Sequence, residues 1–269
     1  MANIEKSLHG LRLLDDFARK DTAIHKIHPL IIFLVSISFI AVVTSFGQYE
    51  IVAILPLIFY PVIIFSMARI PTTPILVRAL IVMPLILGIG LFAVIFDKSL
   101  IVWGSGVYYG GWFNFISLII KYGLVVIAAL LMISTTGIDK LSCAMRMIRI
   151  PKLVVLQIML TYRYISVIGE QIAITVRAYR LRSYGKKGIH ITAWGPLIGQ
   201  LILRTFDRSQ HIYTAMRLRG FSGDYHTGQR QKIHFADIVY LVSWVAFFVI
   251  IRIYNIPTLL GSVLTEVIK

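Results

Sequence analysis

Long apolar runs alternate with short polar segments over most of this 269-residue chain. A helix needs about 20 mainly apolar residues to cross the hydrocarbon core of a bilayer. Pro56 and Pro61 lie inside the second run and predict a bend, which neighbouring membrane helices can accommodate. The pattern predicts five membrane-spanning helices, at about residues 30–46, 51–68, 79–96, 114–134 and 235–251.

The segments that join the first four runs are short. Residues 47–50 predict a turn, and residues 69–78, with two prolines, predict a short connection. In the third run, Gly88-x-Gly90 is typical of close packing between membrane helices. Residues 97–113 are rich in Trp, Tyr and Gly, which is typical of the membrane–water interface. Lys121, near the start of the fourth run, is expected to snorkel to the interface or to face the protein interior.

The pattern changes in residues 135–232, between the fourth and fifth runs. Thr135 to Asp139 predict a helix end followed by a new helix to about residue 148. Pro151 predicts the start of a second helix, which runs to about residue 181. A third helix, at about 193–220, carries an apolar stripe of helical period. These three helices form a predicted amphipathic platform.

The first part of the second platform helix, residues 153–168, is almost a membrane span. Gln157 and Arg163 lie at its middle, however, and Glu170 follows just beyond it. An arginine at the centre of a bilayer costs about 2.5–3.5 kcal/mol. We therefore expect this helix to pack against the other helices or to lie in the interface.

Composition and charge favour a membrane protein over a soluble one. Hydrophobic residues make up 58% of the chain and charged residues 14%, whereas soluble proteins carry about 25% charged residues. The net charge is +15, and 16 of the 27 Lys and Arg residues lie in residues 137–232. Attraction to anionic lipid at the cytoplasmic face explains this clustering, so nucleic-acid binding is not expected.

The distribution of basic residues predicts the topology. Residues 1–28, 69–78 and 135–232 hold most of them, and the alternate connections hold few. The positive-inside rule then places the N-terminus and the platform in the cytoplasm. We predict an all-α polytopic membrane protein with a cytosolic N-terminal lead, four spanning helices, a cytosolic platform, and a last spanning helix with its tail. Their ranges are 1–28, 29–134, 135–232 and 233–269.

Sequence patterns that carry chemistry are absent. The chain has no GxxxxGK[ST] phosphate loop, no HExxH, no CxxC and no GxSxG. The predicted spans hold almost no acids, and there are no inverted repeats of the kind found in many secondary transporters. The platform is therefore interpreted as a docking surface for another protein. No catalytic residue and no cofactor are expected.

Three residues were considered for metal or redox chemistry. Cys143 is the only cysteine, so an intrachain disulfide is not possible. His25-x-x-His28 could present two ligands on one helix face, but no third ligand follows at a typical interval. An ordinary pair of histidines beside the membrane is favoured over a metal site. Residues 1–28 also lack the apolar segment of a cleavable signal peptide.

Several runs of the platform resemble the T component of energy-coupling factor (ECF) transporters. The resemblance is carried by TTGIDKLSCAMRMIRIPKLVVLQIMLTYRYISVIGEQI (135–172) and RSQHIYTAMRLRGFSG (208–223). The start, LDDFARKDTAIHKIHPLIIF (14–33), resembles the cobalt-type CbiQ branch. The resemblance implies an L-shaped helical fold in the membrane of a prokaryotic cell.

In that family two cytosolic coupling helices end in a three-residue motif centred on Arg, usually Ala-Arg-Gly. The matching residues here are Leu181-Arg182-Ser183 and Leu218-Arg219-Gly220. Leu replaces Ala in both motifs, and Ser replaces Gly in the first. Arg180 is an adjacent candidate for the first arginine. From the spacing alone, Arg219 could also be a simple helix-end cation followed by a C-cap glycine.

The resemblance implies a mechanism with several partners. Each Arg would enter a groove on one of two ABC ATPases of the CbiO type, and closure of the ATPase dimer would move the two coupling helices. That motion would reach a substrate-binding membrane subunit of the CbiM/CbiN type. Arg163, Glu170 and Asp207 are expected to brace the platform, Arg163 by pairing with Glu170 or stacking on a tyrosine, and Asp207 by pairing with Arg204 or His211.

Two alternative interpretations place the chain in a different functional class. A stand-alone secondary transporter or channel would transport without ATPases, and a membrane enzyme would need chemistry that the sequence does not name. The resemblance of the N-terminal residues favours cobalt, while nickel or a vitamin stays open, because a separate subunit selects the substrate in this family.

Overall fold

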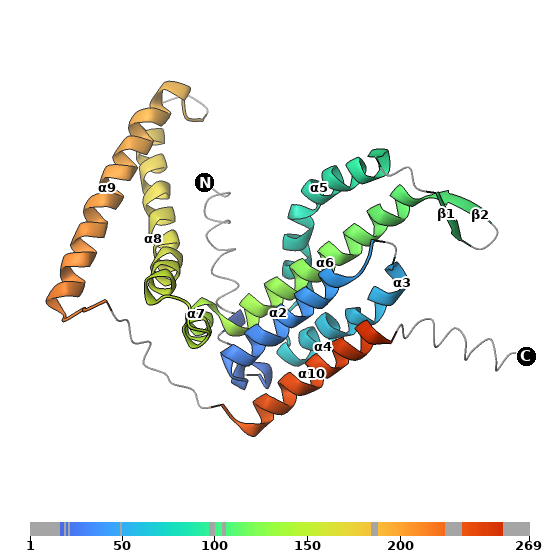
Figure 1. Cartoon of the computed structure of the whole chain (residues 1–269). Coiled ribbons are helices and arrows are strands. Elements are labelled where there is room, and N and C mark those ends of the chain that lie inside the picture. The colour runs from blue at the N-terminus through green and yellow to red at the C-terminus, as the bar shows by residue number, and fades with distance from the viewer. Residues whose placement is uncertain are drawn as a thin grey trace, which may run out of the picture. The chain divides into compact units, whose positions relative to one another are not determined.

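The computed structural model describes residues 17–18, 20, 22–48, 50–96, 100–103, 106–183, 188–223 and 233–254. These residues divide into two compact units, and Figure 1 shows the helices of both. Residues 17–137 and 233–254 form the first unit, which we call the bundle, and residues 138–183 and 188–223 form the second, the platform. The predicted lead at 1–28 and the tail after 254 lie largely outside the described residues.

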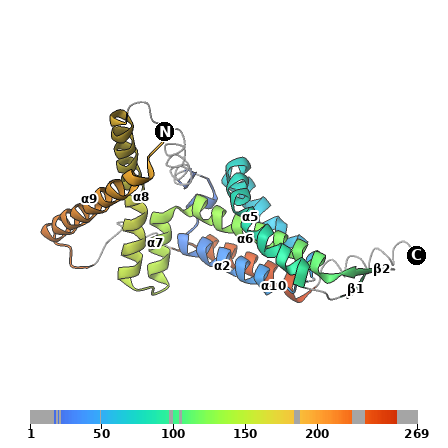
Figure 2. The same cartoon turned by 90° about the horizontal axis from the view of Figure 1, so that it is seen from above.

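The bundle is helical apart from one two-stranded antiparallel ribbon. Its elements are η1 (Ile24–Lys26), α2 (Pro29–Ser45), α3 (Ile51–Ile54), η2 (Leu55–Ile58), α4 (Phe59–Ala68), α5 (Thr72–Phe96), β1 (Leu100–Trp103), β2 (Gly106–Tyr109), α6 (Gly110–Thr136) and α10 (Phe235–Ile253). The helix α2 packs against both α6 and α10, and α5 runs along α6 (Figures 1 and 2).

Aromatic residues from three segments form the centre of the bundle. The rings of Phe39 and Tyr60 stack with centroids 4.4 Å apart, and Phe248 lies against both. All three side chains are buried. The hydroxyl of Tyr60 lies 3.2 Å from the Ser36 hydroxyl, which satisfies the polar end of this buried ring. These contacts join α2, α4 and α10 at one point.

One of the two prolines of the second run interrupts its helix as predicted, whereas Pro61 lies in the first turn of α4. Pro56 lies in the 3-10 turn η2, between α3 and α4.

The predicted connection at 69–78 is wrong beyond its first three residues, because α5 already begins at Thr72. Pro74 falls in the first turn of α5, where backbone N–H groups have no partner within the helix, so it does not delay the helix start. Arg69, with φ of 48°, ends α4 in the left-handed conformation.

Gly90 allows α5 to approach α6 closely, as the glycine pattern predicts. A Cβ at this position would lie 2.5 Å from the ring of Phe115. The neighbouring Gly88 has open space around it and contributes nothing comparable. Only the second glycine of the pair is therefore required by packing.

Five segments are long and apolar enough to cross a membrane: 51–68, 72–96, 110–136, 152–182 and 235–253. Four of these contain the predicted second to fifth runs. The first run is α2, which is shorter at 17 residues, and 152–182 was expected to pack or to lie in the interface. The chain is an all-α polytopic membrane protein.

The platform consists of α7 (Ile138–Met147), α8 (Lys152–Arg182) and α9 (Ile191–Leu218). Each begins within two residues of its predicted start. Helix α7 packs on the first part of α8, where Ala144 and Val155 are buried. Tyr179 accepts a hydrogen bond from the backbone N–H of His190 at 3.3 Å, which links the end of α8 to the start of α9.

Candidate functional site

The two predicted arginine motifs lie at the ends of two different helices, and the first of them is near the start of α9, because Tyr179 of α8 bonds to His190. Arg182 is the last residue of α8, just before the connection to α9, and Arg219 directly follows the last residue of α9. A helix of 28 residues is about 42 Å long. The motifs therefore form two separate sites on the platform, too far apart to serve a single small groove.

Both motifs present their side chains to the surroundings. Leu181 is 79% exposed and Leu218 85% exposed, and both arginines are exposed. Within the described residues, neither guanidinium makes a hydrogen bond or an ion pair. A guanidinium is rigid and permanently charged, so it is suited to carboxylates or carbonyls in a groove on a partner protein. The exposed leucine beside each arginine is suited to an apolar surface next to that groove.

The second motif is held by a glycine-dependent helix cap. Gly220, with φ of 81°, donates its N–H to the Arg217 carbonyl at 3.0 Å, and Phe221 donates to the Met216 carbonyl at 3.0 Å. This pair of bonds is the Schellman arrangement, in which the glycine position requires a positive φ. The structure therefore confirms that Gly220 caps the C-terminus of α9. This cap fixes the backbone direction at Arg219.

The first motif ends differently, which explains its serine. Ser183 has φ of −93°, and its N–H donates to the Tyr179 carbonyl at 2.9 Å. A residue with negative φ needs no glycine. The replacement of Gly by Ser in this motif is therefore compatible with its backbone, whereas the same replacement at Gly220 would be strained.

Arg180, the alternative to Arg182, is also exposed. Two residues on a helix are separated by about 200°, so Arg180 and Arg182 leave α8 on nearly opposite sides. A partner that docks on one side contacts only one of them, which allows mutations to distinguish the two.

The predicted bracing residues are exposed. Arg163 and Glu170 lie on α8, and Asp207 lies on α9. The bracing role of these three residues stays a prediction.

The histidine pair of the bundle has structural partners. His25 is buried; its Nε2 donates to the Phe17 carbonyl at 2.9 Å, so in the neutral ring Nδ1 accepts from the Thr22 hydroxyl at 2.7 Å. Nδ1 of His28 accepts the N–H of Leu30 at 3.2 Å and caps α2. No group of three potential metal ligands occurs among the described residues.

One buried acid in the bundle was missed by the sequence analysis. Asp237 accepts the backbone N–H of His28 at 3.2 Å through one oxygen and that of His234 at 2.9 Å through the other. It thereby links the residues that precede α2 and α10. An acid three residues after the residue that precedes a helix is typical of a capping box. This spacing could have predicted the hydrogen bond from His234 to Asp237, but not the one from His28.

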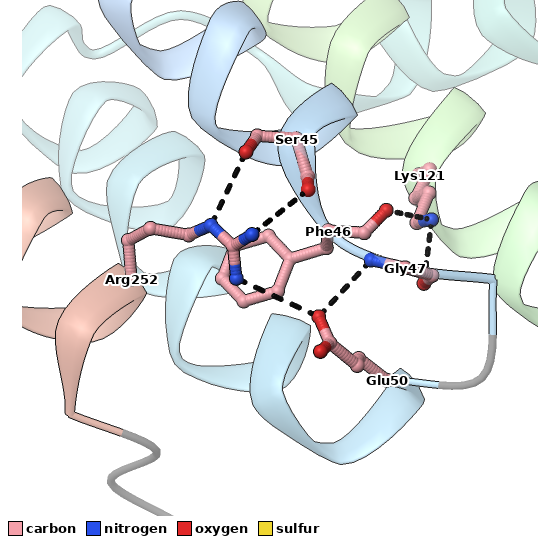
Figure 3. A network of polar contacts seen from close by, with 6 residues as sticks. All are labelled: Ser45, Phe46, Gly47, Glu50, Lys121 and Arg252. Carbon is pink, nitrogen blue, oxygen red and sulfur yellow. Dashed lines mark hydrogen bonds and ion pairs between the residues drawn. The ribbon is translucent and has the colours of Figure 1, made fainter.

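A second polar network surrounds the turn after α2 (Figure 3). Lys121 of α6 donates to the carbonyls of Phe46 and Gly47 at 2.8 and 2.9 Å, so it faces the protein rather than snorkelling. Arg252 of α10 donates to the carbonyl and the hydroxyl of Ser45, both at 3.2 Å, and lies over the Phe46 ring. Two cations thus satisfy the last carbonyls of α2.

An acid completes this network. Glu50 accepts the N–H of Gly47 at 3.0 Å and lies 3.7 Å from a guanidinium nitrogen of Arg252 (Figure 3). The turn after α2 is therefore bonded to α6 and α10 at once. Its contacts join three parts of the bundle at one turn.

Comparison with protein families places the chain among transport proteins. The sequence profile of the CbiQ cobalt transport proteins matches residues 21–231, which include both arginine motifs. The chain belongs to the CbiQ family. It is accordingly a multi-pass membrane protein of a transport family.

Two curated relatives match parts of this CbiQ-family chain. The nickel permease LarQ of Lactiplantibacillus plantarum is 25% identical over 117 residues, which cover 42% of this chain and 43% of LarQ. The uncharacterized protein MJ1571 of Methanocaldococcus jannaschii is 27% identical over 137 residues, covering 50% of this chain and 47% of that protein. The matched stretches span about half the length of these relatives. The helix α10 lies beyond the residues that the CbiQ profile matches.

Proposed function

We propose that this CbiQ-family protein is the transmembrane energy-coupling subunit of an ECF-type ABC importer. The observation that carries the proposal is the placement of two exposed arginines, Arg182 and Arg219, at the ends of the two long platform helices, α8 and α9. The chain has no phosphate-binding loop of its own. Two separate docking points on a chain without an ATP site are suited to two ATPase subunits.

The proposed partners follow from these docking points. Arg182 and Arg219 each enter a groove on one ABC ATPase of the CbiO type, with Leu181 and Leu218 against the apolar wall of the groove. Ser183 and Gly220 set the direction in which each arginine leaves its helix. Nucleotide-driven movement of the ATPases passes through the platform to a substrate-binding subunit of the CbiM/CbiN type. The N-terminus and the platform lie on the cytoplasmic side of a prokaryotic cell membrane.

The proposed substrate is cobalt ion, in agreement with the description of the matching family. The name of LarQ favours nickel as the second candidate. Among the described residues there is no cluster that could hold a metal ion. Selection of the ion is therefore assigned to the substrate-binding subunit.

Charge reversal tests the docking roles. We expect Arg182→Glu and Arg219→Glu, made separately in the complex with its ATPases, each to weaken ATPase co-purification and to lower ATP-dependent cobalt uptake. Loss of a buried charge pair at an interface costs about 2–5 kcal/mol, which is more than a tenfold loss of affinity. Arg204→Glu is the matched control, because Arg204 is exposed on α9 and lies outside both motifs, and Arg180→Glu tests the alternative to Arg182.

The controls decide between docking and general electrostatics. If Arg204→Glu weakens the complex as much as the motif variants, the effect comes from platform charge and the docking roles are wrong. If Arg180→Glu weakens it and Arg182→Glu does not, the role of Arg182 is wrong and Arg180 is the docking residue. Unchanged co-purification and uptake in both motif variants would also reject them. Cobalt uptake by this chain alone in liposomes, without ATPases, would instead identify a stand-alone transporter.

A further inference from the structure

A single residue connects α6 of the bundle to α7 of the platform. Helix α6 ends at Thr136 and α7 begins at Ile138, with only Gly137 between them. Gly137 has φ of 73° and ψ of 155°, a backbone conformation that is essentially restricted to glycine. The division of the chain into its two units also falls directly after this residue. Rotation about the backbone of Gly137 can therefore move α7 without bending either helix.

A residue of the N-terminal segment lies directly against Gly137. A Cβ at Gly137 would lie 3.1 Å from the Cβ of Ala18, which is tighter than an ordinary van der Waals contact. Gly137 is buried, and Ala18 and its neighbour Phe17 are each 9% exposed. The space beside the glycine is thus filled, so a backbone rotation into this space requires Ala18 to move.

Short polar contacts hold Phe17 and Ala18 in place. The buried His25 donates from Nε2 to the Phe17 carbonyl at 2.9 Å, and the backbone N–H of Lys20 donates to the same carbonyl at 3.2 Å. The ammonium of Lys20 donates to the carbonyl of Arg69, at the end of α4, at 3.2 Å, and lies 5.1 Å from the centre of the Phe17 ring. We call Phe17, Ala18, Lys20 and His25 the latch. None of these contacts is a backbone bond of a spanning helix, so the latch can move while the spans stay intact.

Two hydroxyl groups next to Gly137 lack a hydrogen-bond partner among the described residues. They belong to Ser134 and Thr136, which are 0% and 2% exposed. Thr135, between them, donates to the Leu131 carbonyl at 2.8 Å in the usual way. A buried polar group without a partner costs free energy, whereas contact with water satisfies it. Opening of this connection therefore offsets part of the packing that is lost when Ala18 leaves Gly137.

We propose that Gly137 is a hinge for the platform and that the latch keeps this hinge closed, so that the latch is displaced when the platform moves. The part that the hinge plays in transport rests on the proposed energy-coupling function, whereas the latch rests only on the contacts described above. A glycine that merely ends α6 gives a different expectation. In that case the side chains of His25 and Lys20 have no influence on the residues around Gly137.

Thiol labelling of the full-length protein in nanodiscs tests the latch. The native cysteine is removed by Cys143→Ala, and a reporter thiol is placed beside the hinge by Thr136→Cys. The control reporter is Ser117→Cys, because Ser117 lies on the same helix, is 1% exposed and also has a hydroxyl without a partner in the described part of the chain. We expect a water-soluble maleimide to label both thiols slowly when the latch is intact.

His25→Ala and Lys20→Met each remove one contact that holds the latch. We expect each variant to raise the labelling rate at position 136 several-fold and to leave the rate at position 117 unchanged. Lys26→Met is the matched control, because Lys26 is an exposed cation of the same segment, and it is expected to change neither rate. Unchanged labelling at position 136 in both latch variants would overturn the proposal. Equal increases at positions 136 and 117 would show that the whole bundle loosens, and would overturn it as well.

Nucleotide tests the hinge in the complex with the ATPases. We expect ATP to raise the labelling rate at position 136 several-fold. Gly137→Ala is expected to raise the rate without ATP and to remove most of this response, because its Cβ meets Ala18 and its backbone is strained. A rate at position 136 that does not respond to ATP while the ATPases stay bound would reject the hinge. Failure of the ATPases to co-purify would instead reject the proposed function, and labelling of the protein alone would still decide whether the latch exists.

Discussion

At the end of α9, the backbone of one residue determines the direction of a proposed docking arginine. Gly220 has φ of 81°, and nothing lies within 4 Å of the position that a Cβ would occupy. The requirement for glycine is therefore conformational and not steric. Ser183 occupies the equivalent place in the first motif with a negative φ, so the backbone there does not require glycine.

We expect Gly220→Val to loosen the end of α9 while Ser183→Val leaves the end of α8 nearly unchanged. A β-branched residue in the left-handed conformation costs about 1–2 kcal/mol, and the two hydrogen bonds of the cap would be strained. Hydrogen exchange of the amides of Gly220 and Phe221, followed by mass spectrometry, measures this effect. Gly220→Asn is the matched control, because Asn adopts positive φ more readily. Exchange as slow in Gly220→Val as in the unmodified protein would contradict this account of the cap.

At the scale of elements, the bundle is joined by cations that bond to the carbonyls at the end of α2. Lys121 and Arg252 come from different helices and bond to consecutive residues of the same turn (Figure 3). A helix end presents unpaired carbonyls, so two cations there satisfy both hydrogen bonding and the helix dipole. This arrangement makes the turn after α2 the point where α6 and α10 are both fixed.

We expect Lys121→Met to lower the thermal unfolding midpoint of the purified protein in detergent. The substitution keeps the length of the side chain but leaves the carbonyls of Phe46 and Gly47 without their donor. An unsatisfied buried polar group costs about 1–3 kcal/mol. Arg252→Met is expected to act similarly, and the double variant to lose less than the sum, because both cations stabilise one turn.

The matched control for these variants is Arg204→Met, an exposed cation of the platform. It is expected to leave the unfolding midpoint nearly unchanged. Additive losses in the Lys121 and Arg252 double variant would show that the two cations act independently, contrary to the shared role of the turn.

At the scale of the whole molecule, the parts that could be predicted from sequence are those set by local pattern. The starts of α7, α8 and α9, the break at Pro56 and the close approach at Gly90 follow from caps, prolines and small residues that act within a few positions. The predicted start of α5 is wrong because two prolines near it favour a connection, although the first turn of a helix accepts proline.

Contacts between distant residues could not be predicted in this way. The bond between His28 and Asp237 joins residues 209 positions apart, and that between Ser45 and Arg252 joins residues 207 apart. No periodicity relates such positions, because their proximity depends on how the helices pack. The two arginine motifs were found from resemblance, and their separation along α9 became evident only from the bounds of the helix.

The separation of the motifs leads to a prediction for the transport cycle, which rests on the proposed coupling role. If α9 transmits movement between its ends, it must remain straight while the ATPases open and close. We expect nitroxide labels at Gln200→Cys and Arg217→Cys, in the Cys143→Ala background, to give a narrow distance distribution near 26 Å, from about 1.5 Å per residue. Pulsed electron–electron double resonance on the complex measures this distance. We expect the distance to be the same with and without ATP.

A second label pair reports movement between the two long platform helices. Labels at Leu153→Cys and Arg217→Cys lie on the start of α8 and the end of α9, which are not joined by the hydrogen bond between Tyr179 and His190 at the opposite end. We expect this distance to change when ATP binds, because α8 and α9 can pivot about their linked ends. A change within α9 combined with a constant distance between the helices would mean that α9 bends, and it would contradict transmission by a straight helix.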